Sequence, residues 1–267
     1  MGDPGQRAVT GPAPRPGDVA LATRLVRDAG TLAHRMRSEG LEARTKTSVS
    51  DLVTAADHAA ERLVADTLAQ ERPDDGLLGE EGAGRDGSTG RRWIVDPVDG
   101  TYNFVAGLEW WCSALALTVD DELVLGAVHH PATGRTFVGG PGLPTTVDGE
   151  PVGELPDRPL SESCLTTYLH PPAYDGPAGA AFRRMVGGAA TLRMLGSASM
   201  DAVAVAEGRL HVRCQHSMPP WDDLPGAALV LGVGGAVRRV WAGGVEWSAA
   251  GAPTAVAELS ERLLAAG

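Results

Sequence analysis

Residues 93–104, WIVDPVDGTYNF, combine acidic side chains with a tight turn. The first three residues are apolar and predict a buried strand, which ends at Asp96. Asp99 and Gly100 follow as a turn dipeptide, after which the backbone N–H groups of Gly100 and Thr101 can face an anion. Hard oxygen ligands beside anion-binding amides are what a magnesium-dependent phosphate site requires. The plainer alternative is a solvated turn capped by aspartates.

A second acidic pair follows another short apolar run. Residues 77–78 predict a buried strand, and Glu80 and Glu81 come directly after it. Adjacent glutamates are most often a solvated pair. If this strand and the strand over 93–95 are neighbours in one sheet, however, Glu80 lies close to Asp96 and Asp99. The polar, glycine-rich stretch between the two strands is expected to be a loop.

The composition of the chain excludes several classes of function. A formal net charge of −11 over 267 residues argues against a nucleic-acid surface, which needs a basic patch. No apolar run is long enough to span a bilayer, and the N-terminus lacks the apolar segment of a signal peptide. Three cysteines without a C-x-x-C pair indicate reduced core residues rather than a zinc site or a disulfide framework. We therefore expect a cytoplasmic protein without nucleic-acid or membrane partners.

Hydrophobic periodicity predicts the elements that position these side chains. A helix is expected from Asp18 to Gly40, and a second one from a cap at Asp51 to Gln70, with Leu52 and Asp57 inside it. A meander of three strands should follow the central motif, and strands alternate with helices in the second half. The expected strands are 112–119, 123–130, 135–138, 163–169, 191–195, 210–214 and 236–240, and the later helices are 178–186, 199–207, 223–232 and 254–266.

The domain organisation follows from where Pro and Gly accumulate. Residues 1–16 are predicted to be a disordered N-terminal arm. Residues 139–159 are rich in Pro and Gly and show no strong periodicity. We therefore expect an N-terminal α+β subdomain over 17–145 with most of the acidic ligands, and a C-terminal α/β subdomain over 146–267.

Five motifs occur in a fixed order along residues 18–266: DLVTAAD (51–57), GEE (79–81), WIVDPVDGTYNF (93–104), LRMLGSASMD (192–201) and WDDLPGA (221–227). Together they resemble the inositol monophosphatase family of metal-dependent phosphomonoesterases. The resemblance implies an α/β fold, a layered αβαβα sandwich with the site between its two halves. It also implies lithium sensitivity and a homodimer.

The resemblance also assigns roles to individual residues. It implies a first Mg²⁺ on Glu80, Asp96 and the carbonyl of Val98, and a second on Asp96, Asp99 and Asp222, with two or three Mg²⁺ per site. Thr101 would position the attacking water, with Asp57 bonded to its hydroxyl, and Glu80 would act with them in catalysis. The substrate would contact Gly100, Thr101, Gly196, Ser197, Ala198 and Gln215. Like charges this close cannot all stay ionised without cations, which supports the metal assignment.

Departures from the family pattern concern the substrate. Gln215 stands where inositol phosphatases commonly carry a glutamate, Pro219-Pro220 stiffens the approach to Trp221, and Tyr102 replaces a small residue. The expected reaction is Mg²⁺-dependent hydrolysis of a small polyol, cyclitol or sugar monophosphate. Histidinol phosphate, fructose 1,6-bisphosphate and a nucleotide 3′-phosphate are alternative substrates. A catalytically silent, cation-binding homologue is the alternative from another functional class.

Overall fold

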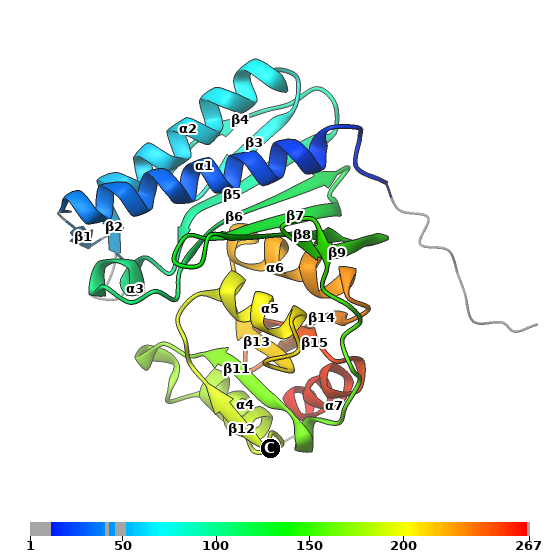
Figure 1. Cartoon of the computed structure of the whole chain (residues 1–267). Coiled ribbons are helices and arrows are strands. Elements are labelled where there is room, and N and C mark those ends of the chain that lie inside the picture. Colours follow the sequence, from blue (N-terminus) through cyan, green and yellow to red (C-terminus); the bar gives the residue numbers. More distant parts are fainter. Residues whose placement is uncertain (1–11, 41–42, 46–51, 266–267) are drawn as a thin grey trace, which may run out of the picture.

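The protein folds as five alternating layers of helices and sheets (Figure 1). The structure is a computed structural model and describes residues 12–40, 43–45 and 52–265. The outer helices on one side are α1 (Asp18–Glu39) and α2 (Ala55–Glu71), those between the two sheets are α5 (Ala198–Ala206) and α6 (Pro220–Gly232), and those on the other side are α4 (Pro177–Val186) and α7 (Pro253–Leu264). The predicted αβαβα sandwich is confirmed.

The first sheet has eight strands in the order β10-β9-β8-β7-β6-β5-β3-β4. Their bounds are β3 (Gly76–Gly79), β4 (Gly84–Arg85), β5 (Arg91–Asp99), β6 (Cys112–Val119), β7 (Glu122–His130), β8 (Arg135–Gly140), β9 (Leu143–Val147) and β10 (Glu150–Pro151). β3 and β5 are parallel neighbours, and the other pairs are antiparallel. The expected pairing of the two strands that end in carboxylates is therefore confirmed.

The second sheet has five strands in the order β12-β11-β13-β15-β14. Their bounds are β11 (Cys164–Tyr168), β12 (Thr191–Arg193), β13 (Val212–His216), β14 (Ala236–Ala242) and β15 (Val245–Gly251), and the 3₁₀ turns η1 (Leu160–Glu162) and η2 (Pro171–Ala173) flank β11. β12, β11 and β13 run parallel. Their carboxyl ends therefore meet at one edge of the sheet, where ligand sites of α/β proteins commonly lie.

The predicted start of the second helix is wrong. α2 begins at Ala55, and Leu52 belongs to the strand β2 (Leu52–Thr54), which pairs with β1 (Ala43–Thr45). Thr54 is extended, and its hydroxyl accepts a hydrogen bond from the N–H of Ala56, so Thr54 is the cap. The cap predicted at Asp51 lies outside the described residues.

Six strands of the described residues were not predicted: β1, β2, β4, β9, β10 and β15. The Gly-Gly pair at 243–244 joins β14 to β15, and both glycines have positive φ, as a two-residue hairpin loop requires. Trp247 on β15 is fully buried, so this added strand of the second sheet contributes to the core. β9 and β10 extend the meander of strands into residues 139–159, where the sequence shows no strong periodicity. The division into two subdomains stays a prediction.

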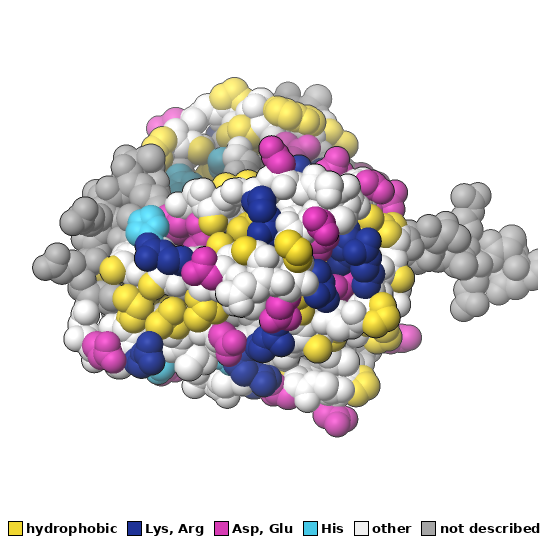
Figure 2. Space-filling view, turned by 90° about the horizontal axis from the view of Figure 1, so that it is seen from above, with side chains coloured by type: hydrophobic (Ala, Val, Ile, Leu, Met, Phe, Trp, Pro, Cys, Tyr) yellow, Lys and Arg dark blue, Asp and Glu magenta, His cyan; other side chains and the backbone are white. Residues whose placement is uncertain are grey.

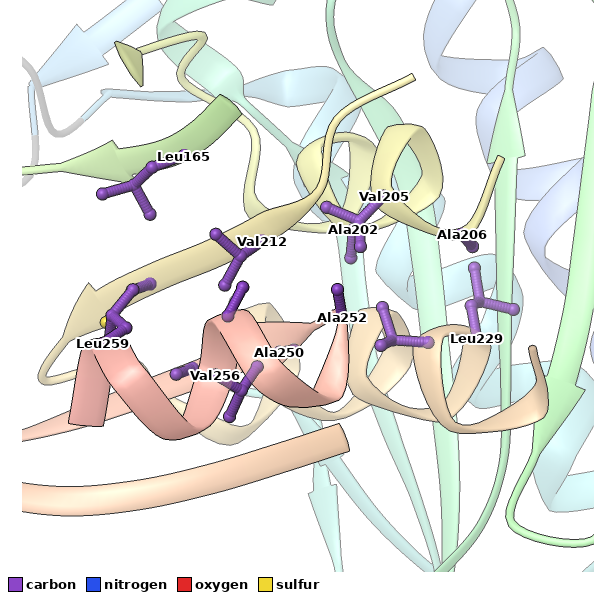
Figure 3. Packing of buried hydrophobic residues seen from close by; sticks show 14 of the residues in the cluster. Leu165, Ala202, Val205, Ala206, Val212, Leu229, Ala250, Ala252, Val256 and Leu259 are labelled. Carbon is purple, nitrogen blue, oxygen red and sulfur yellow. The ribbon is translucent and has the colours of Figure 1, made fainter. Parts of the chain in front are cut away.

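The central layer packs closely against both sheets. An added Cβ at Gly126 on β7 would lie 2.3 Å from the carbonyl oxygen of Pro225, and one at Gly226 would lie 2.4 Å from Cβ of Ala202 on α5. α6 can therefore approach both the first sheet and α5 at backbone distance. Figure 3 shows buried side chains of α5, α6, β13 and α7 meeting, among them Val205, Leu229 and Val256. This packing fixes the start of α6, where Asp222 lies.

The surface beside α1 and α2 carries acidic and basic side chains in a mixed pattern (Figure 2). No helix among the described residues is long and apolar enough to cross a membrane.

A buried ionic cluster ties α1 to the first sheet. Arg91 on β5 contacts Asp18 of α1 at 2.6 Å and Asp75 at 3.2 Å, and the indole N–H of Trp93 also donates to Asp75. All four side chains are buried. Burial alone would raise the pKa of Asp75, but hydrogen bonds from Thr89, Trp93 and Arg91 lower it below its ordinary value. Arg91 is thus the cation that the two interior carboxylates share, and Arg72 contacts Asp18 in addition at 3.3 Å.

We predict that Arg91→Met lowers the free energy of unfolding by about 3–5 kcal/mol, because it leaves two interior carboxylates without their shared cation. Urea denaturation followed by circular dichroism measures this loss. The matched control is Arg92→Met at the exposed neighbouring position, which should change stability by less than about 0.5 kcal/mol. Equal effects of the two substitutions would contradict the role of the cluster.

Candidate active site

A cavity of about 370 Å³ lies between the two halves of the molecule. Its walls come from the ends of β3 and β5, from α3 (Thr101–Ala106), from the carboxyl ends of the parallel strands β12, β11 and β13, and from the first turns of α5 and α6. Eleven of the residues singled out from the sequence line it: Glu80, Asp96, Val98, Asp99, Gly100, Thr101, Gly196, Ser197, Ala198, Gln215 and Asp222. The twelfth, Asp57, lies behind the wall and bonds to Thr101.

A bulge in β5 brings Asp96 and Asp99 to the same cavity. Asp96 pairs with Ala114 and Asp99 with Cys112, so one extra residue of β5 is accommodated between them. Side chains three residues apart in a regular strand face opposite sides, and the added residue restores a common direction. The N–H of Val98 donates to Asp96 Oδ1 at 3.0 Å and fixes that carboxyl group.

Asp99 joins the two halves through backbone hydrogen bonds. The N–H groups of Ala198 and Ser199, in the first turn of α5, donate to its two carboxyl oxygens at 3.2 and 2.5 Å. Burial raises the pKa of Asp99, and these bonds, with the positive end of the helix dipole, oppose the rise. The second half is therefore docked on a carboxylate of the first.

Four carboxyl groups face this one cavity: Glu80, Asp96, Asp99 and Asp222. Burial, followed by the negative charges of Glu80, Asp99 and Asp222, raises the pKa of Asp96 well above its ordinary value. The pKa of Asp222 is raised for the same reasons, burial first. Together the groups form a concentrated negative potential that a cation would relieve. In the described part of the chain, no three His, Cys, Asp or Glu side chains are already gathered closely enough to hold a metal ion.

Thr101 is held at the edge of the cavity by two acceptors. Its hydroxyl lies 3.0 Å from the carbonyl oxygen of Val98 and 3.3 Å from Oδ1 of Asp57. Asp57 is fully buried at the third position of α2, where its other oxygen accepts the N–H of Thr54 in a capping box. The hydroxyl hydrogen points to these acceptors, so the oxygen lone pairs of Thr101 are available to a molecule in the cavity.

An ionic cluster anchors the first turn of α6, next to Asp222. The buried Arg213 on β13 contacts Asp223 at 2.7 Å, and Arg239 and Ser248 bind the same carboxylate. Burial alone would raise the pKa of Asp223, but the charge of Arg213 and these hydrogen bonds lower it below its ordinary value. The side chain of Asp222 is thereby aimed from a fixed helix.

Sequence reasoning missed two polar residues of the site. The amide nitrogen of Asn103 donates to the carbonyls of Trp110 and Leu195 at 2.8 and 2.7 Å and so joins α3 to the chain before Gly196. Asp201 accepts from the indole of Trp110, and burial raises its pKa to about 7. Asn103 lies in the motif at 93–104 and Asp201 in the motif at 192–201, but the residue types alone do not indicate these hydrogen-bond partners.

Three comparisons agree with this geometry. A model of the inositol monophosphatase family matches residues 18–266. The fructose-1,6-bisphosphatase/inositol-1-monophosphatase of Thermotoga maritima is 33% identical over 219 residues, which are 81% of this chain and 82% of that protein. The histidinol-phosphatase of Mycobacterium tuberculosis is 36% identical over 220 residues, 77% of this chain and 80% of that protein. The solved structure of Thermotoga maritima IMPase superposes with a TM-score of 0.79 at 27% identity and covers 92% of this chain and 96% of that one.

The fold, the acidic cavity and these matches define a phosphoric monoester hydrolase. The chain belongs to the inositol monophosphatase family, as its five motifs predict. The relatives carry names with different substrates, so family membership establishes the reaction class and leaves the alcohol open.

We predict that Asp223→Asn lowers the free energy of unfolding at neutral pH by about 3 kcal/mol, because Arg213 loses its buried counter-charge. Asp223 has a lowered pKa when folded, so its contribution is present above the unfolded pKa of about 4 and is lost as the pH falls through the folded value. The difference between the two proteins should therefore shrink below about pH 4.

Urea denaturation between pH 7 and about pH 3.5 measures this trend. Asp66→Asn, at an exposed position of α2, is the matched control and should show no comparable loss. A stability difference that does not change with pH would contradict the charge-based account.

Proposed function

We propose that this enzyme is a Mg²⁺-dependent phosphomonoesterase that uses water to hydrolyse the phosphate ester of a small alcohol. The observation that carries the proposal is the convergence of four carboxyl groups from both halves on one cavity, beside the amides that follow Asp99. The raised pKa values of Asp96 and Asp222 indicate that these groups are costly to ionise without added positive charge. A divalent cation would supply that charge.

The donor set fits magnesium, because it consists of carboxylate and carbonyl oxygens and contains neither thiolate nor imidazole. Glu80, Asp96 and the carbonyl of Val98 would hold a first Mg²⁺, and Asp96, Asp99 and Asp222 a second; the family implies two or three ions per site. When bound, the ions would lower the pKa of water, cancel the charge of the phosphate dianion and neutralise the departing alkoxide. The Val98 carbonyl has a second lone pair beside the one that Thr101 uses.

The remaining roles belong to the chain itself. Thr101, held by Asp57, would orient the attacking water through its free lone pairs, with Glu80 facing the same water. The amides of Gly100 and Thr101 would bind phosphate oxygens. Gly196, Ser197 and Ala198 would border the alcohol, although the N–H of Ala198 is already bonded to Asp99.

The sequence favours a polyol, cyclitol or sugar monophosphate, with histidinol phosphate, fructose 1,6-bisphosphate or a nucleotide 3′-phosphate as alternatives. Within the described residues, no lysine or arginine lines the cavity, which argues against the bisphosphates. We also infer from the family that the enzyme acts as a cytoplasmic homodimer; sedimentation equilibrium tests the assembly.

We predict that purified enzyme releases phosphate from small phosphate monoesters only with Mg²⁺, and that Asp99→Asn lowers this turnover at least about 100-fold. Loss of a residue that merely supports a metal ligand typically costs about 10–100-fold, so loss of a ligand should cost more. Circular dichroism should show an intact fold, and Asp121→Asn, an exposed acid in a hairpin loop, serves as the control. Turnover that survives both EDTA and Asp99→Asn would contradict the metal assignment, whereas a lack of Mg²⁺-dependent turnover on every small phosphate monoester would favour the catalytically silent homologue.

We also predict that lithium inhibits turnover, because a small monovalent cation can occupy one of the carboxylate positions. Initial rates measured against LiCl, with KCl at equal ionic strength as the control, test this. Equal rates in the two salts would argue against the expected arrangement of cation positions.

A further inference from the structure

The three parallel strands β11, β12 and β13 end at the cavity, whereas Glu80, Asp96 and Asp99 come from the ends of β3 and β5 and Asp222 from α6. Tyr168 is the last residue of β11, Gln215 is its direct partner on β13, and Met194 follows the end of β12. All three line the cavity together with His170 and Leu195. We call these five residues the strand-end wall.

The strand-end wall is largely aromatic and apolar. The rings of Tyr168 and His170 meet edge to face, with centroids 4.7 Å apart and an angle of 69°. Met194 is 43% exposed, so its thioether is available to a ligand. Tyr102 of α3, contributed by the other half of the molecule, lines the same cavity and is 53% exposed. Exposed aromatic and thioether groups at a cavity are the groups that pack against a flat ring.

Polar groups at the wall are few or already occupied. The carboxylate of Asp201 is buried and accepts hydrogen bonds from Trp110 and Thr166. Gln215 and the tyrosine hydroxyls remain for a ligand. A polyol with several hydroxyls, the alcohol that the sequence favours, would leave some of them unpaired against Met194 and Leu195, so the wall argues against it.

The charged groups at the wall disfavour a second anionic group on the alcohol. Within the described part of the chain, the cavity has no lysine or arginine, and Asp201 adds a carboxylate on this side. A second phosphate or a carboxylate on the alcohol would therefore meet His170 but no lysine or arginine here.

We propose that the preferred substrate is a phosphate monoester whose alcohol carries one aromatic or heteroaromatic ring and no second anionic group. This proposal rests on the proposed phosphatase function. The phosphate lies at the four carboxyl groups, and the ring lies against Tyr168, His170 and Met194. This assigns Tyr168 as a specificity-determining residue.

The test compares 2-phenylethyl phosphate with 2-cyclohexylethyl phosphate and glycerol 1-phosphate, in the presence of Mg²⁺. The first two have similar alkoxide leaving groups and similar size, so they differ mainly in the flatness and π-system of the ring. We expect the highest kcat/KM for 2-phenylethyl phosphate. Tyr168→Leu should lower its kcat/KM relative to glycerol 1-phosphate about tenfold, mainly through KM, because an aromatic contact of this kind is worth about a factor of ten.

Two further variants separate the ring from other effects. Tyr168→Phe keeps the ring and should retain the preference. Tyr174→Leu changes an exposed tyrosine that does not line the cavity and should leave the ratio of the substrates unchanged. A higher kcat/KM for glycerol 1-phosphate, or a loss with Tyr168→Leu that is equal for all substrates, would overturn the proposal while the phosphatase assignment stands.

A binding measurement decides the proposal independently of turnover. The non-hydrolysable 3-phenylpropylphosphonate should bind the Mg²⁺-loaded wild type about tenfold more tightly in calorimetry than its cyclohexyl counterpart does. Equal affinities would overturn the ring preference. Absence of Mg²⁺-dependent phosphate release from every substrate would overturn the proposed function instead, and the calorimetric result would still stand.

Discussion

The mutual repulsion of the four cavity carboxyl groups is the constraint on which the rest of the structure depends. Asp96 and Asp99 are buried, and their negative charge is opposed by hydrogen bonds and by the first turn of α5. Such an arrangement is tolerable in a stable fold only if the surrounding elements are held firmly. The close packing of α6, the cluster around Asp223 and the cap at Thr54 all provide that support.

The two halves of the molecule contribute different properties to the site. The first half supplies most of the negative charge, through strands that are buried on both faces. The second half supplies the neutral strand-end wall, through strands whose last residues are partly exposed. The bond between Asp99 and α5 places these two surfaces opposite each other. The same reaction can therefore be kept while the alcohol that is accepted changes.

Residue types and spacing were sufficient to predict most elements and the carboxylates that follow two strands. The layered sandwich and the full set of cavity residues were implied by the resemblance to the inositol monophosphatase family. Apolar runs predicted β3 and β5 as buried strands that end in acids; their pairing was a condition of the argument, which the structure meets. The bulge between Asp96 and Asp99 has no signal in the sequence, since it depends on the register with β6. The cap at Thr54 was missed because Asp51 is an equally good capping residue by type. β15 was missed because no element was predicted between 240 and 254, although Gly243-Gly244 is a pair typical of a hairpin turn. Asn103 and Asp201 form hydrogen bonds with residues about 90 positions away in the sequence, and local sequence patterns do not indicate such contacts.

The position of the strand-end wall has a consequence for evolution. Residues at the ends of β11, β12 and β13 carry little of the core, whereas the residues a few positions earlier, such as Leu165 and Val212, are buried in it. Substitutions at the strand ends are therefore nearly free of penalties in folding. Single substitutions at these positions can therefore change which alcohol the enzyme accepts, while the protein at each step stays stable and catalytically competent.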